Sequence, residues 1–153
     1  MEIERKFVAD GVPEAIAQAA GRDLRQGYVA VDEQAEARVR ADGDSHVLTI
    51  KGGHGLTRTE VELELDAGRF DALWALTEDR RVTKTRHRVD LADGLVAEVD
   101  VYSGALAGLV TAEVEFPDEA ASAAFDPPAW LGREVTGDKR YANQRLAVDG
   151  RPA

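Results

Sequence analysis

The chain has 153 residues, of which 44% are hydrophobic and 31% are charged. This length fits one domain spanning residues 1–153, and the apolar fraction is too high for a disordered protein. A net charge of −10 disfavours binding to nucleic-acid backbones, and the absence of cysteine excludes disulfides and thiolate metal sites. No apolar run approaches the roughly 20 residues of a membrane span, and the N-terminus is charged from its second residue. We therefore expect a cytoplasmic protein with no membrane or nucleic-acid partner.

Most of the sequence alternates polar and apolar residues with period two, which is typical of β-strands. In chain order we expect a strand at 1–8, a helix at 12–21, strands at 23–30, 36–43, 45–53 and 58–65, a helix at 66–80, strands at 82–89, 94–102 and 108–116, and helices at 117–125 and 139–148. Asp66 is the expected cap of the second helix. Eight strands with few helices predict a mainly antiparallel α+β fold whose sheet curls or closes to protect its edges.

The polar half of each strand is unusually rich in charge. Because residues two apart lie on one face of a strand, nine carboxylates and eight cations share that face. The carboxylates are Glu2, Glu4, Glu60, Glu62, Glu64, Glu98, Asp100, Glu113 and Glu115, and the cations are Lys6, Arg38, Arg40, Lys51, Arg58, Lys84, Arg86 and Arg88. The strands around 38–40 and 84–88 are purely basic on this face, whereas those around 98–100 and 113–115 are purely acidic.

Periodicity alone does not distinguish a face in bulk solvent, the commoner arrangement, from one that lines a lumen. Two features favour a charged face that binds a ligand. Arginine outnumbers lysine on the charged face, and the clustering of like charges along one strand costs repulsion that an opposite charge must offset. A polyphosphate would neutralise the basic strands, and Mg²⁺ or Mn²⁺, which prefer oxygen ligands, would neutralise the acidic ones.

Several motifs are shared with a known family. The N-terminal ExExK pattern at 2–6 is followed by QGY at 26–28, RVR at 38–40, LTIKG at 48–52, RTEVELE at 58–64, KTR at 84–86, EVDVY at 98–102, GLVTAEVEF at 108–116 and GREVTGDKRYANQRLA at 132–147. In this order they resemble the CYTH superfamily, or triphosphate tunnel metalloenzymes, above all its short bacterial members. The resemblance implies an eight-stranded closed β-barrel tunnel with a charged interior and a few covering helices.

The resemblance also implies roles for individual residues. The metal ligands would be Glu2, Glu4, Glu113 and Glu115, with Glu62 and Asp100 as further candidates. The triphosphate would be gripped by Lys6, Arg38, Arg40, Lys84 and Arg86, with Arg58 as a weaker candidate. By the same resemblance, Lys51 and Tyr28 would form a catalytic dyad. This has a physical rationale, since a lysine that is crowded by cations and desolvated exchanges its proton nearer neutral pH. The expected reaction is hydrolysis of the terminal phosphate of inorganic triphosphate with Mg²⁺ or Mn²⁺, and nucleoside triphosphates are further candidate substrates.

Three other functions stay open at this point. Adenylate cyclase and thiamine triphosphatase activities occur among CYTH relatives, although the sequence identifies no adenine pocket and both tryptophans, Trp74 and Trp130, look structural. A non-catalytic polyphosphate- or nucleotide-binding module would use the same charged face. The C-terminal segment also allows two interpretations. Either it lies across one tunnel mouth with Tyr141 and Asn143 facing the lumen, or it is a packing helix with Tyr141 and Leu146 in the core.

Overall fold

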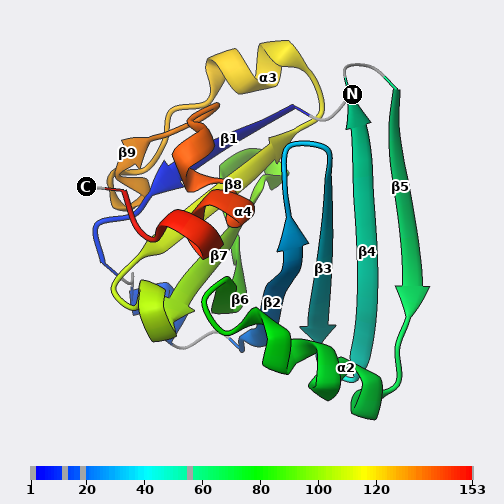
Figure 1. Cartoon of the computed structure of the whole chain (residues 1–153). Coiled ribbons are helices and arrows are strands. Elements are labelled where there is room, and N and C mark those ends of the chain that lie inside the picture. Colours follow the sequence, from blue (N-terminus) through cyan, green and yellow to red (C-terminus); the bar gives the residue numbers. More distant parts are fainter. Residues whose placement is uncertain (1–2, 12–13, 18–19, 55–56, 153) are drawn as a thin grey trace.

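The computed structural model describes residues 3–11, 14–17, 20–54 and 57–152. One antiparallel sheet holds nine strands in the order β5-β4-β3-β2-β6-β7-β8-β1-β9 (Figure 1). The strands are β1 (Ile3–Val8), β2 (Arg22–Val31), β3 (Ala35–Asp42), β4 (Ser45–His54), β5 (Thr57–Glu64), β6 (Arg81–Asp90), β7 (Val96–Ser103), β8 (Val110–Phe116) and β9 (Arg133–Glu134). The α-helices are α1 (Glu14–Ala17), α2 (Ala67–Trp74), α3 (Glu119–Ala124) and α4 (Asn143–Asp149). The single-turn 3₁₀ helices are η1 (Ala75–Thr77), η2 (Ala92–Gly94), η3 (Gly104–Leu106), η4 (Ala129–Leu131) and η5 (Lys139–Tyr141).

All eight predicted strands are present, but the prediction of an eight-stranded closed barrel needs correction. A ninth strand, β9, pairs with Phe7 and Val8 of β1, and in the described residues the sheet is open between β5 and β9. Closure would require β5 to pair with the outer edge of β1. That edge is already taken, because Val135 N donates to Lys6 O at 2.8 Å and Lys6 N donates to Thr136 Oγ1 at 3.0 Å.

Helices cover two parts of the outer face of the sheet. Helix α2 begins as predicted at Asp66, whose side chain accepts a hydrogen bond of 2.7 Å from Arg69 N. Its Phe70 is fully buried in a cluster with Val39 and Ala41 of β3, so α2 fixes the β2–β4 part of the sheet. Among the described helices, none combines the length and apolarity needed to cross a membrane.

A second outer cluster joins β1, β7 and β8 to the segments around α1 and α3. Phe7, Ile16 and Leu131 are buried in it, and Phe125 packs at its border. Arg5 ties these segments together, because it donates to the carbonyl of Ser122 and forms a two-point ion pair with Glu134 of β9. With apolar contacts on the outer face, the charged half of each strand faces the inside of the curl.

The C-terminal segment lies inside the curl, at one end of the inner face (Figure 1). Tyr141 and Leu146 are buried there against inner-face side chains of three strands, Tyr28, Val82 and Tyr102. Helix α4 therefore covers the apolar end of the inner face and leaves the charged part uncovered.

Candidate active site

Charged side chains from both sides of the curled sheet, β3–β5 on one side and β1, β7 and β8 on the other, line one cavity of about 1040 Å³. Strand register explains the arrangement, since Glu4 lies opposite Glu115, Glu98 opposite Glu113, and Arg86 opposite Asp100, with all side chains of this set on the inner face. The ionic residues in the lining are Glu4, Arg38, Arg40, Lys51, Glu60, Arg86, Arg88, Asp93, Glu98, Glu113 and Glu115. The charged face thus encloses a space instead of lying flat in solvent.

One wall of this cavity is acidic and comes from β1, β7 and β8. It consists of Glu4, Glu98, Glu113 and Glu115, which supply only oxygen donors. Such a donor set fits a hard divalent cation such as Mg²⁺ or Mn²⁺. Within the described ranges, no three acidic or histidine side chains converge on a single metal position. Glu2, the first of the predicted ligands, lies outside the described residues.

Two predicted metal ligands are placed away from the acidic wall. Glu62 lies on β5, at the far edge of the open sheet, and lines a smaller cavity of about 150 Å³ with Arg38 and Arg40. Asp100 is buried and makes ion pairs with Lys84 and Arg86. The metal-ligand roles that the resemblance implied for Glu62 and Asp100 stay predictions.

The opposite wall is basic and comes mainly from β3, β4 and β6. Arg38, Arg40, Lys51 and Arg86 all line the cavity as expected. Burial, together with repulsion from Arg86 and Arg38, lowers the pKa of Arg40 although Asp42 acts in the opposite direction. Crowding of this kind is relieved by an anion that accepts hydrogen bonds from several guanidinium groups.

The two predicted lysine ligands of the triphosphate lie deeper, against the C-terminal segment. Lys6 Nζ donates to the carbonyl of Tyr141 at 2.7 Å and lies 3.5 Å from Glu113. Lys84 Nζ donates to Asn143 Oδ1 at 3.4 Å. Both interpretations of the C-terminal segment therefore hold in part, since Tyr141 is in the core while Asn143 contacts an inner-face cation.

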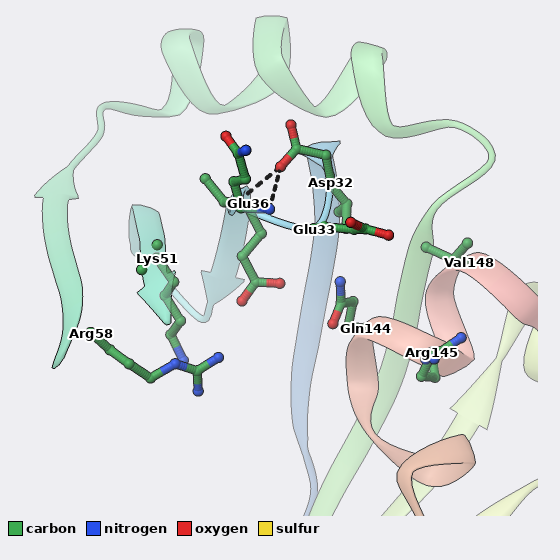
Figure 2. Close-up of a pocket in the computed structure, with 13 residues that line it drawn as sticks. Asp32, Glu33, Glu36, Lys51, Arg58, Gln144, Arg145 and Val148 are labelled. Atoms are coloured by element: carbon green, nitrogen blue, oxygen red, sulfur yellow. Dashed lines mark hydrogen bonds between the residues drawn. The ribbon is translucent and has the colours of Figure 1, made fainter. Parts of the chain in front are cut away.

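A second cavity of about 480 Å³ opens between α4 and the end of the sheet that carries the β2–β3 and β4–β5 turns. Figure 2 shows Lys51 and Arg58 reaching toward each other from β4 and β5, with Glu36 and Gln144 pointing into the same space. The adjoining β2–β3 turn is held by Asp32, which accepts hydrogen bonds from the two backbone amides drawn in Figure 2. Lys51 lines both cavities, so it stands at their junction. Arg58 lies in the second cavity and not in the first.

Tyr28 is fully buried on the inner face of β2. Its hydroxyl accepts a hydrogen bond of 3.1 Å from Gln26 Nε2. Burial, together with the charge of Glu36, raises the pKa of Tyr28. The pairing of Tyr28 with Lys51 stays a prediction.

Comparison with known proteins decides the family. The model of the CYTH domain matches residues 1–144. This chain belongs to the CYTH domain family. The domain is 45% identical over 148 residues to the inorganic triphosphatase of Nitrosomonas europaea, covering 96% of this chain and 97% of that protein. It is 42% identical over 147 residues to the inorganic triphosphatase of Acetivibrio thermocellus, covering 95% of this chain and 92% of that protein.

Solved structures agree with the sequence relatives. The crystal structure of the inorganic triphosphatase NE1496 matches this CYTH domain with a TM-score of 0.86 and 42% identity, covering 97% of this chain and 95% of that one. A putative adenylate cyclase from Bacillus halodurans matches with a TM-score of 0.51 at 18% identity, covering 82% of this chain and 86% of that one, which shows a shared fold alone.

Glu98, Glu36 and Gln144 are among the residues of the CYTH domain's site to which the sequence assigned no role. Glu98 lines the acidic wall and Glu36 lines the second cavity, and both have the same strand parity as residues that were assigned. Parity was therefore a sufficient signal for these two. Gln144 comes from α4, and no periodicity in the sequence indicates that this helix folds back over the inner face.

Proposed function

We propose that this CYTH domain is a divalent-metal-dependent triphosphatase that releases the terminal phosphate of inorganic triphosphate. The observation that carries the proposal is the opposition of an acidic and a basic wall across one cavity. The names of the two relatives at 42–45% identity support the same reaction.

The basic wall binds and orients the substrate. Arg38 and Arg40 project from alternate positions of one strand, so their guanidinium groups can bind oxygens of successive phosphates. Arg86 approaches from β6 and holds the chain against the acidic wall. Positioning of this kind is the main protein contribution to phosphoryl transfer, because the transition state is stabilised mostly by charge and alignment.

The acidic wall holds the metal. Glu4, Glu113 and Glu115 are the proposed ligands, joined by Glu2 from the same N-terminal motif, and Glu98 is a further candidate. When bound, Mg²⁺ or Mn²⁺ would neutralise phosphate oxygens and help to orient the attacking water. Four carboxylates facing a triphosphate without a cation would repel it, so substrate and metal are expected to bind together.

Lys51 and Tyr28 are proposed to take part in proton transfer at the terminal phosphate of the substrate. Lys51 stands where the two cavities meet. The protonated Tyr28 hydroxyl would orient a neighbouring group by donating a hydrogen bond.

We further propose that the ligated protein encloses the substrate as a tunnel. Triphosphate and metal neutralise both walls, which removes the like-charge repulsion within each wall and draws the β4–β5 hairpin toward β1. Enclosure would come from side chains, because β9 occupies the β1 edge. Amide hydrogen exchange in β4 and β5 should slow when tripolyphosphate and Mg²⁺ are added together, and an unchanged exchange rate would refute the enclosure.

Organic triphosphate esters are a second candidate substrate class, favoured by one observation. An apolar cavity of about 600 Å³, lined in part by Phe125 and Trp130, shares Asp93, Leu95 and Pro117 with the charged cavity. An aromatic group attached to the phosphates would fit there. If so, Trp130→Ala should lower kcat/KM for nucleoside or thiamine triphosphate and leave that for tripolyphosphate unchanged.

The test of the main proposal is phosphate release from tripolyphosphate by the purified protein with Mg²⁺ or Mn²⁺. Glu4→Gln and Lys51→Ala should each lower kcat/KM by at least about 100-fold, as expected when a metal ligand or an active-site cation is lost. Glu119→Gln, on the exposed surface of α3, is the matched control and should retain full activity. Tight binding of tripolyphosphate without phosphate release would instead support a non-catalytic binding module, and formation of cyclic AMP from ATP would support a cyclase.

A further inference from the structure

An ion cluster of Asp100, Lys84 and Arg86 joins the basic wall to the buried interior beneath it. Asp100 Oδ1 accepts from Arg86 Nε at 2.8 Å, and Asp100 Oδ2 accepts from Arg86 Nη2 at 3.1 Å. Lys84 Nζ lies 2.8 Å from the same Oδ2 atom. Only 6% of the Lys84 side chain and 9% of the Asp100 side chain are exposed, against 20% for Arg86.

The three residues differ in their access to the cavity. Arg86 lines it, whereas Lys84 and Asp100 are not among the residues of the lining. Because Asp100 takes Nε and Nη2 of the guanidinium group, the remaining nitrogen, Nη1, points toward the cavity, where it lies 3.3 Å from Glu98. Asp100 thus fixes which edge of Arg86 faces the ligand.

Charge in the cluster is consistent with this role. Although burial acts in the opposite direction, hydrogen bonds from Arg86 and the charge of Lys84 keep the pKa of Asp100 below its ordinary value. With both bases protonated, the Asp100 carboxylate compensates one of two cations, and Nη1 of Arg86 contacts Glu98 on the cavity side. A carboxylate engaged by two bases is a poor metal ligand, because the metal would have to displace both ion pairs.

We propose that Asp100 is a positioning residue for phosphate binding, which acts by holding Arg86 side-on so that Nη1 faces the triphosphate. The ion pair of Lys84 with Asp100 completes this arrangement, which we call the clamp, because it keeps the Asp100 carboxylate from turning toward the cavity. This inference rests on the proposed triphosphatase function, and it is an alternative to the metal-ligand role that the family resemblance implied for Asp100.

The decisive experiment is a double-mutant cycle on tripolyphosphate hydrolysis. Asp100→Asn should lower kcat/KM by about 10- to 100-fold, chiefly through a higher KM, since the Nε–Nη2 edge of Arg86 is no longer held by a carboxylate. In Arg86→Ala protein, adding Asp100→Asn should change kcat/KM by less than about 3-fold, because Asp100 acts through Arg86. If the two losses multiply, or if Asp100→Asn leaves KM unchanged, the positioning role is wrong.

A matched control comes from the C-terminal turn. Asp138 makes the same side-on pair with Arg140, at 3.0 and 2.7 Å, but on the exposed surface. Asp138→Asn should therefore leave KM within about 2-fold of the unsubstituted protein. A rise in KM as large as that of Asp100→Asn would show that loss of any arginine–aspartate pair perturbs the assay, and would overturn the inference.

A second measurement covers the case in which Asp100→Asn fails to fold. In the unsubstituted protein, the Arg86 Nε–H resonance should exchange with water at least about 100-fold more slowly than in free arginine, because it donates to a buried carboxylate. Exchange at the rate of free arginine would refute the clamp. Failure of the proposed function has a different signature, namely an unsubstituted protein that releases no phosphate. The cycle is then run on tripolyphosphate dissociation constants, with the same criterion of additivity.

Discussion

Replacement of Leu146 by alanine tests whether the C-terminal segment is part of the folded core. Leu146 is 1% exposed and packs with Tyr28, Val82 and Tyr102 at the covered end of the inner face. Truncation of a buried leucine costs about 2–5 kcal/mol, and a site near the chain end, which can partly collapse, belongs in the lower half of that range. We expect a loss of about 3 kcal/mol in the free energy of unfolding. For a chain of this size, that corresponds to a fall in Tm of about 6–12 °C.

Val148 supplies the control, because it lies on the same helix and is 48% exposed. Val148→Ala removes apolar atoms that already contact water, so its cost should stay within about 0.5 kcal/mol. Urea unfolding followed by circular dichroism measures both variants, with equal m-values as the check on two-state behaviour. If Leu146→Ala costs no more than Val148→Ala, helix α4 does not pack over the inner face in solution.

Three further predictions concern pH, catalysis and metal. Because the pKa of Asp100 is lowered in the folded state, its contribution to stability is present above its unfolded value, which lies near 3.8, and is lost as the pH falls through the lower folded value. When Tm is measured between pH 2 and 7, it should therefore decrease at pH values below about 4. The decrease should be smaller in Asp100→Asn, and parallel curves of Tm against pH for the two proteins would contradict this. Tyr28→Phe should lower kcat at least about 10-fold while costing only about 1 kcal/mol of stability, the value of one buried hydrogen bond. Unchanged kcat would exclude Tyr28 from the chemistry. Chelation by EDTA should abolish phosphate release, and Mg²⁺ or Mn²⁺ should restore it, with Glu115→Gln requiring about 10-fold more metal; activity that survives chelation would refute metal dependence.

Strand content was predictable because period-two alternation is strong throughout this chain. The Asp66 cap and the buried Phe70 face of α2 follow from local sequence in the same way. The two-residue strand β9 could not be predicted, because Arg133–Glu134 is too short to show any periodicity. Its pairing with β1 is set by long-range contacts such as the Arg5–Glu134 ion pair.

Parity along the strands predicted which side chains share the inner face, but not their depth. Arg86 and Lys84 occupy equivalent positions of β6, yet one lines the cavity and the other is buried beneath it. The difference arises from Asn143 and Tyr102, which contact Lys84 from α4 and β7. Strand parity carries no information about a helix that folds over the sheet, so the depth of each lysine required the structure.

Because the sheet is open, its acidic and basic sides can be connected by a bound ligand. Within the cavity lining, Glu4, Glu98, Glu113 and Glu115 come from β1, β7 and β8, whereas Arg38, Arg40 and Lys51 come from β3 and β4, with Glu60 of β5 beside Lys51. In the described residues no hydrogen-bonded strand pairing joins β5 to β1 or β9, so within the sheet β3 and β4 connect to β7, β8 and β1 through β2 and β6. An anionic chain that binds the basic side and shares a cation with the acidic side would supply the missing link. Strong binding should therefore require both charges in one ligand complex, which a triphosphate–metal pair provides and phosphate alone does not.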